Sequence, residues 1–117
     1  MRVQAITRNV RMSAQKMREV VRQIQGLPAQ RAQAVLAFVP RKSARFVAKT
    51  LNSAIANAQD LKEHKKEYHS LKTDRLRIKE AVAQTASTLR RVALKARGTS
   101  GRILKRNCHI KIILSDE

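Results

Sequence analysis

The strong positive charge of this sequence, and its uneven distribution, most restrict what the chain can fold into. The 117 residues include 26 Lys and Arg against 8 Asp and Glu, which gives a formal net charge of +18. Charge of one sign repels itself and destabilises a compact state unless a polyanion neutralises it. Nucleic acid is the obvious polyanion, because Lys and Arg release condensed counterions when they contact phosphates. An anionic membrane surface is the competing partner.

Basic and acidic residues occupy different parts of the chain. Residues 81–115 contain eight Lys and Arg and no Asp or Glu, and Glu19 is the only acid before Asp60. The remaining acids lie between residues 60 and 80 and at the C-terminal end. We therefore expect the acids to mark the solvent side, and the acid-free segment together with the first helical region to face the anionic partner.

Length and composition exclude several classes of protein. The chain is long enough for one domain with a modest core, which its 43% of hydrophobic residues can fill. It has no apolar run long enough to span a bilayer and no secretory signal at its start. Because Cys108 is the single cysteine, we expect a cytosolic protein without an internal disulfide. One Cys and three distant His are too few ligands for a metal site, and no cofactor is expected. Aromatic residues make up 3%, which argues against recognition of bases by stacking and favours contacts to phosphates and sugars.

Three helices are predicted in the first half of the chain. Ser13 is suited to cap the first, whose apolar residues recur at helical spacing before a terminating glycine, over residues 14–26. A second, short helix is predicted over residues 28–40. The third has one apolar face over residues 44–58, and its many alanines allow another element to approach closely. The charged residues 60–70 either extend this helix or form a loop, and a frayed helix end leading into a loop is favoured.

Strands and a long hairpin are predicted elsewhere. Apolar and polar residues alternate over residues 2–10, 71–79 and 108–115, which is typical of half-buried strands. The intervening residues, about 81–108, have no persistent helical stripe and carry two glycines near the middle. Two arms of about 12 residues that meet there would reach on the order of 40 Å. A hairpin of this length buries no core of its own, so it needs a partner to hold it.

Three segments resemble one known family. VRMSAQKMREVVRQIQG, at residues 10–26, resembles that family's first helix with its arginine, serine and lysine start. LNSAIANAQ, at residues 51–59, resembles its Ser-Ala-Ile-Ala-Asn-Ala helix. KARGTSGRILKRNCHIKIIL, at residues 95–114, resembles its Arg-Ala-Arg-Gly hairpin tip, basic arm and His-Ile strand. In this order and spacing, the chain resembles the universal large-subunit ribosomal protein twenty-two family over nearly its whole length. It departs from the family at Leu94, where proline is usual, and at Thr99, where arginine is usual.

The resemblance implies both a fold and a function. The fold is α+β, with three helices packed on a small three-stranded antiparallel sheet and a long protruding β-hairpin, about residues 81–108 of a single domain, 1–117. The function is that of a structural constituent of the large ribosomal subunit, not an enzyme, which binds 23S-type ribosomal RNA and supports assembly. The hairpin is expected to line part of the peptide exit tunnel. The implied partners are this RNA, neighbouring large-subunit proteins and the nascent peptide near the hairpin tip, in the cytoplasmic ribosome, with no membrane and no small-molecule substrate.

Candidate RNA-binding residues come from the family motifs and from the basic charge. The positions that match the family motifs are Ser13, Lys16, Arg18, Asn57, Lys95, Arg97, Gly98, Arg102, Lys105, Arg106 and His109. Further basic candidates are Arg8, Arg11, Lys42, Arg90 and Arg91.

Structural alternatives stay open for several candidates. Basic residues on the helices are as compatible with a solvated face as with RNA contact, whereas the acid-free hairpin favours RNA contact, because a solvated arm would gain from mixed charges. Asn57 is equally suited to a hydrogen bond with backbone. His109 is more typical of a sheet residue with a local hydrogen bond than of a catalytic base. Gly98 and Gly101 are expected to serve turn geometry first.

Other functions are compatible with parts of the sequence. A DNA-binding architectural protein also uses a basic β-arm in the minor groove, with Leu94 as a candidate apolar wedge, but the helix motifs argue against it. An RNA-processing or hydrolytic enzyme is not favoured, because the sequence shows no paired carboxylates, phosphate-binding glycine loop or nucleophile with its base. A membrane-surface peptide would fit the charge but not the helix-and-strand pattern.

Overall fold

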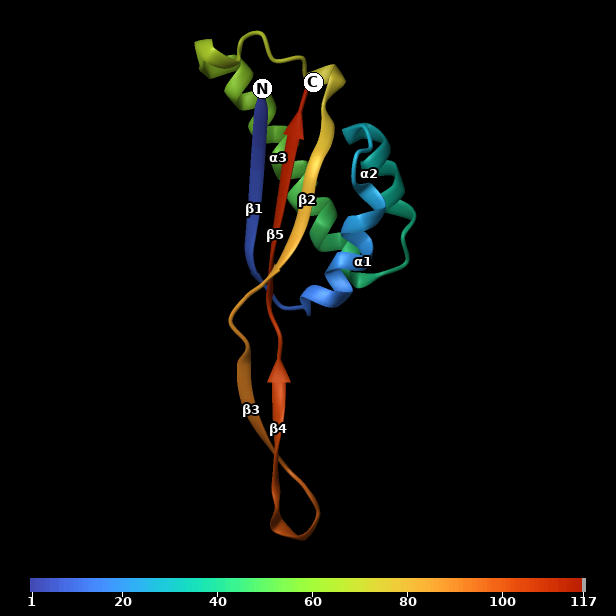
Figure 1. The fold of residues 1–117 in the computed structure, drawn as a ribbon, viewed down its shortest axis with the longest axis vertical. Helices are drawn as coiled ribbons and strands as arrows, with labels where there is room; N and C mark the ends of the chain where they lie inside the picture. Colours follow the sequence, from blue (N-terminus) through green and yellow to red (C-terminus); the bar gives the residue numbers. More distant parts are fainter. Residues whose placement is uncertain (117) are drawn as a thin grey trace.

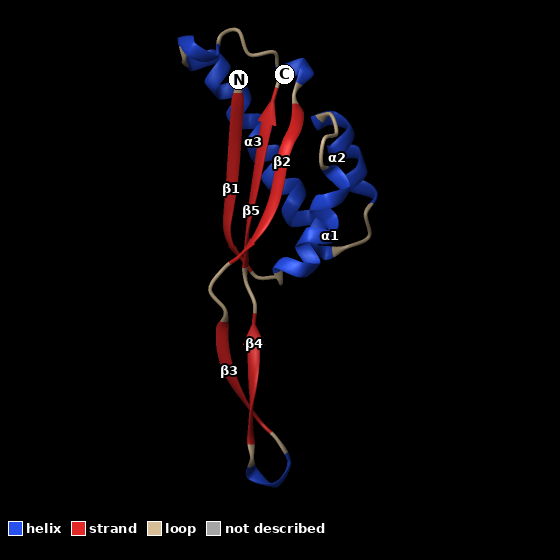
Figure 2. Ribbon diagram, in the orientation of Figure 1, coloured by secondary structure: helices blue, strands red, loops and turns tan. Residues whose placement is uncertain are grey.

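The computed structural model describes residues 1–116, and within them three α-helices lie against a three-stranded sheet from which a two-stranded arm protrudes (Figure 1). The elements are β1 (Arg2–Val10), α1 (Ala14–Ile24), α2 (Ala29–Phe38), α3 (Lys42–His64), β2 (Arg77–Thr85), β3 (Leu89–Leu94), β4 (Ser100–Lys105) and β5 (Cys108–Ser115). Figure 2 shows that both chain ends lie at the end of the sheet opposite the arm. The predicted α+β class is confirmed.

The central sheet has the strand order β1–β5–β2, and both pairings are antiparallel. β5 lies in the middle because every second residue from Cys108 to Leu114 is apolar and buried against the helices. Val3 and Ala5 of β1 lie opposite Leu114 and Ile112 and share the buried face. The strands predicted at residues 2–10 and 108–115 are confirmed.

β2 begins and ends later than the sequence pattern predicts. The predicted strand covered residues 71–79, whereas β2 covers Arg77–Thr85 and follows a loop with one turn of 3-10 helix at Thr73–Arg75. Ala81 and Ala83 are buried in this strand, next to α1. Alanine has low strand propensity, so the pattern gave no signal for a strand here, but its small side chain leaves room for the helix.

α1 packs across β2 and has the bounds that its sequence predicts. The apolar stripe of residues 17–24 is buried, and the backbone N–H of Lys16 donates to Ser13 Oγ at 3.4 Å. Gly26 follows the helix with a φ of +74°, a conformation that glycine adopts without steric cost. Both the N-cap and the glycine end are confirmed.

α3 is the longest helix and contacts β1, β5 and the other two helices. The predicted face over residues 44–58 is buried, except that Ile55 is half-buried. The helix continues to His64, beyond the frayed end that was favoured. There the ring of His64 lies 3.1 Å from the carboxylate of Asp60, one turn earlier.

β3 and β4 pair with each other and form the arm, apart from the central sheet. At the neck between them and the sheet, the Ala86 N–H donates to the Asn107 carbonyl at 3.1 Å. The Asn107 amide in turn donates to the Ser87 carbonyl at 3.0 Å. The paired arm comprises residues 89–105 and is shorter than the expected 81–108, because both ends of that range belong to the central sheet.

Candidate nucleic-acid interface

Both faces of the arm carry basic and large apolar side chains together. The pairing register assigns to one face Arg90, Val92, Leu94, Arg102 and Leu104, and to the other Leu89, Arg91, Ile103 and Lys105. Val92 is 75% exposed and Leu94 is 88% exposed. A two-stranded ribbon with exposed aliphatic side chains on two faces gains stability only when something covers both of them. Because each face is also basic, a polyanion fits this requirement.

The tip of the arm is a tight loop that its own hydrogen bonds close. The Lys95 N–H donates to the Thr99 carbonyl at 2.7 Å. The Thr99 hydroxyl donates to the Ala96 carbonyl at 2.7 Å, and the Thr99 N–H donates to the same oxygen at 3.3 Å. Arg97 and Gly98 both have positive φ, +61° and +71°, which is uncommon for arginine. The loop therefore holds the exposed Arg97 at the far end of the arm.

Gly101 was expected to serve the turn, but it lies outside the turn. The side chain of Lys95 instead packs closely against it. Gly101 lies in β4, opposite Ala93. A Cβ at this position would collide with the side chain of Lys95, which lies over the glycine. The absence of a side chain at Gly101 therefore leaves room for the aliphatic part of Lys95 to lie against the strand pair.

Arg11 joins the neck to the body, and His109 bonds within the adjoining sheet. The Arg11 guanidinium donates through Nη1 to the Arg106 carbonyl at 2.8 Å. His109 Nδ1 accepts the N–H of Asn9 at 3.0 Å. Asn9 has a φ of +56° and lies where the register of β1 against β5 shifts. His109 is thus a sheet residue, as the sequence favoured, but its hydrogen bond reaches the neighbouring strand β1 and is not local in the chain.

Two candidates on the helices also make structural hydrogen bonds. Arg18 donates through Nε to the Ala83 carbonyl at 3.1 Å and so links α1 to β2. Asn57 donates through Nδ2 to the Gln4 carbonyl at 3.2 Å and links α3 to β1. The backbone alternative for Asn57 is therefore what the structure shows.

The structure places most candidate RNA-binding residues in the arm and at the neck, and a few elsewhere. Ser13, Arg18 and Arg106 line one pocket of about 350 Å³ between the start of α1 and the neck, which continues into the arm. Arg8 is exposed near the end of β1 and Lys16 on the first turn of α1. Lys42 lies at the start of α3 and Asn57 near its other end, so neither belongs to this group.

Cys108 is buried at the neck end of β5. Burial raises the pKa of its thiol, and the nearby Arg18 guanidinium opposes this with a smaller effect. A buried neutral thiol is a poor nucleophile and a poor metal ligand. Among residues 1–116, no three or more His, Cys, Asp and Glu are placed to hold a metal ion. None of the helices described is both long and apolar enough to cross a membrane.

Sequence reasoning missed a group of residues around the connection between α2 and α3. Phe38, at the end of α2, is 88% exposed, although phenylalanine is among the residues most often buried. Arg31, Arg41 and Arg45 surround this connection and were not among the candidates. The only sequence signal was the low acid content of the first half of the chain, which does not distinguish one basic residue from another.

Fold and charge together define a class: a strongly basic α+β protein with a helix-covered sheet and a basic two-stranded arm. The family model of ribosomal protein L22p/L17e matches residues 5–115, and the chain belongs to this family. The large ribosomal subunit protein uL22 of Opitutus terrae is 45% identical over 116 residues, which are 99% of this chain and 96% of the relative. The protein of the same name from Akkermansia muciniphila is 39% identical over 117 residues, 100% of this chain and 98% of the relative. The resemblance read from the three sequence motifs is thereby confirmed.

Proposed function

We propose that this chain is a structural component of the large ribosomal subunit, that it binds 23S-type ribosomal RNA, and that it supports subunit assembly. The arm is the observation that carries the proposal, because it exposes basic and apolar side chains on both faces and has no core of its own. RNA supplies phosphates for the basic groups, and its sugars and base edges cover the aliphatic ones. Family membership supports the ribosomal setting, in the cytoplasm, and a role that is not enzymatic.

The proposed RNA contacts divide between the arm, the neck and the helices. In the arm the basic residues are Arg90, Arg91, Lys95, Arg97, Arg102 and Lys105, and Gly98 shapes the tip. At the neck and nearby the proposed contacts are Arg8, Arg11, Ser13, Lys16, Arg18, Arg106 and His109. Lys42 and Asn57 add contacts at separate places on α3. Several of these side chains already bond within the protein, which fixes them in place for a phosphate.

The tip of the arm is proposed to line part of the peptide exit tunnel, close to the nascent peptide. Its narrowness supports this position, since the loop consists mostly of small residues between Lys95 and Gly101. Lys95 and Arg97 can bind phosphates of the tunnel wall while the thin loop leaves the passage open. The body remains at the surface of the subunit, where neighbouring ribosomal proteins contact it.

A density map of large subunits that contain this chain tests the proposal. We expect continuous density for residues 89–105 between RNA segments, with Arg97 at the tunnel wall. An arm that lies on the outer surface in solvent would contradict the tunnel role while leaving RNA binding possible. Sequencing the nucleic acid that copurifies with the free protein provides the second test, and recovery of DNA in place of ribosomal RNA would contradict the function itself.

A further inference from the structure

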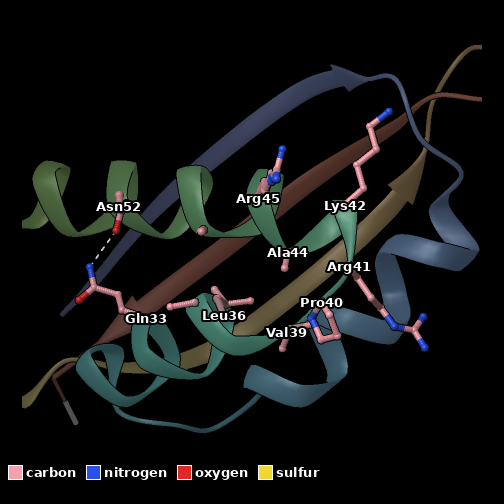
Figure 3. Close-up of a pocket in the computed structure, with 11 residues that line it drawn as sticks. Gln33, Leu36, Val39, Pro40, Arg41, Lys42, Ala44, Arg45 and Asn52 are labelled. Carbon is pink, nitrogen blue, oxygen red and sulfur yellow. Dashed lines mark hydrogen bonds between the residues drawn. The ribbon is translucent and has the colours of Figure 1, made fainter.

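The connection between α2 and α3 has a pocket on each side. Val39, Pro40 and Arg41 line both pockets. One, of about 570 Å³, is mainly apolar and lies beside Phe38, with Arg31 at its edge. The other, of about 900 Å³, lies between α2 and α3 and includes Lys42 and Arg45 (Figure 3). We call the surface formed by Arg31, Phe38, Val39, Pro40, Arg41, Lys42 and Arg45 the α2–α3 corner.

Phe38 is an exposed aromatic residue in a chain that has few aromatic residues. Phe46 and Tyr68 pack against the core, whereas Phe38 has 88% of its surface in contact with solvent. Val39 and Pro40 line the same pocket, so the exposed ring lies beside a mainly apolar surface. Contiguous exposed apolar surface next to polar groups is typical of a binding site, because water-exposed aromatic surface is stabilised when a partner covers it.

The charge around Phe38 indicates the chemistry of that partner. Between residues 14 and 59 the chain has eight Lys and Arg and one acid, Glu19, whose carboxylate pairs with Arg41. The first turn of α3 includes Lys42 and Arg45, so its side chains reinforce the positive end of the helix dipole. Figure 3 shows Lys42 and Arg45 extending from the α3 side of the groove, away from α2. A partner that covers Phe38 must therefore carry negative charge next to a flat apolar group, because Arg31 lines the same pocket as Phe38.

An RNA nucleotide combines these properties in one unit. Its base has a flat face that stacks on aromatic rings, and its backbone carries a phosphate on each side. A protein segment would instead need acidic residues placed around a single apolar side chain. We propose that an unpaired base of the ribosomal RNA stacks on Phe38, while a flanking phosphate binds Arg31, which lines the same pocket. The inference rests on the proposed RNA binding and adds to it a base-stacking contact on the body, outside the arm.

A tryptophan at position 38 makes the contact measurable. The chain contains no Trp, so Phe38→Trp introduces a single indole that keeps a stacking surface. Stacking on a nucleobase quenches indole fluorescence, whereas contact with an apolar protein surface shifts its emission to the blue. We expect quenching that saturates when this variant is titrated with large-subunit ribosomal RNA. A blue shift with RNA-free ribosomal proteins, without quenching by the RNA, would overturn the proposal and make the corner a protein-docking site.

Affinity for the same RNA, measured by filter binding, gives the second readout. Loss of one stacked base predicts that Phe38→Ala weakens binding roughly 5- to 150-fold. Phe38→Trp should bind like the wild type. Ile6→Ala is the matched control, because Ile6 is also exposed, at 44%, but lies on the sheet away from the corner. All three variants should melt at the wild-type temperature.

The outcomes separate this inference from the proposed function. If the wild-type protein does not bind the RNA, the proposed function fails. If the wild type binds, but Phe38→Ala binds equally well and Phe38→Trp is not quenched, RNA binding stands and the stacking contact is overturned.

Discussion

Several candidate RNA-binding residues also make hydrogen bonds that hold the fold together. Arg18, Asn57 and His109 each make a hydrogen bond to backbone that lies far away along the chain. Sequence alone could not assign these bonds, because each depends on which strand the folded chain brings next to the residue. The motifs marked all three residues as candidates, but the fold places Arg18 and His109 near the neck and Asn57 apart from them on α3. Substitutions at these three residues will therefore change stability and RNA binding together.

Asp116 provides a residue-scale prediction about pH. Its carboxylate accepts a hydrogen bond from the α-amino group of Met1 at 3.0 Å and one from the Lys72 N–H at 3.2 Å. These bonds, the first most strongly, lower the pKa of Asp116 below its usual value of 3.8. A lowered pKa means that the stabilisation is complete above the usual pKa and is lost as pH falls through the lowered one.

We therefore expect Asp116→Asn to melt below the wild-type temperature at pH 7. The gap between the two proteins should narrow as the pH falls below 3.8 and the wild-type carboxylate becomes protonated. Thermal melting curves of both proteins across this range provide the measurement. A gap of constant size down to the most acidic condition would show that the ion pair is not the source of the stabilisation.

Cys108 provides a second prediction, because its thiol is the single one in the chain. The side chain is fully buried and its pKa is raised, so little thiolate is present at neutral pH. We expect slow reaction of the native protein with a thiol reagent at pH 8 and fast reaction in denaturant. The rate can be followed by absorbance with an aromatic disulfide reagent. Fast labelling of the native protein would mean that the neck end of β5 opens readily.

At the scale of elements, the sequence predicted the helices and two strands more accurately than β2 and the arm. The apolar stripes of α1 and α3 and the alternation in β5 are local signals, and these elements formed where predicted. β2 was displaced because Ala81 and Ala83 have little strand propensity and are buried only through contact with β5 and α1. The arm was therefore predicted to be too long, because the arm begins only after β2 ends.

A division of labour between the body and the arm is the element-scale prediction. Leu51 of α3 is fully buried, so Leu51→Ala should lower the free energy of unfolding by about 2–5 kcal/mol. Arg97 and Arg102 are exposed in the arm, so replacing both with alanine should leave the free energy of unfolding within about 0.5 kcal/mol of wild type. Urea denaturation measures the first quantity, and filter binding should show that the double variant loses affinity for RNA. If the double variant unfolds more easily, the arm contributes to the core.

On the scale of the whole molecule, the protein is long and narrow, with extents of 66 × 28 × 16 Å. The core draws its residues from Val3 to Ala83 and from Cys108 to Leu114, so the arm adds length and charge without adding to it. The acid-free segment of the sequence predicted which residues carry the excess positive charge. The pairing register of β3 and β4 distributes this charge over two faces of the arm, each of which also carries aliphatic side chains. The sequence could not predict this distribution, because it depends on the register.

This arrangement predicts how strongly salt weakens binding to ribosomal RNA. The arm carries six basic residues, Arg90, Arg91, Lys95, Arg97, Arg102 and Lys105. If each neutralises one phosphate, removing residues 89–105 should reduce the slope of log affinity against log salt by up to about 4 to 5. We expect the neck to tolerate this deletion, because Ala86 and Asn107 already bond to each other and a short Gly-Ser turn can join their neighbours. Filter binding over a range of salt concentrations measures the slope.

An arm of unchanged length in which glutamine replaces the six basic residues is the matched control. It keeps the aliphatic side chains and the pairing of β3 with β4, so it separates charge from shape. Counterion release depends on charge alone, and this variant should therefore lose as much slope as the deletion while retaining more affinity at high salt. If its slope equals that of the wild type, the basic groups of the arm do not contact phosphates. The positive charge on the body would then account for the salt dependence, and the arm would bind through its aliphatic side chains.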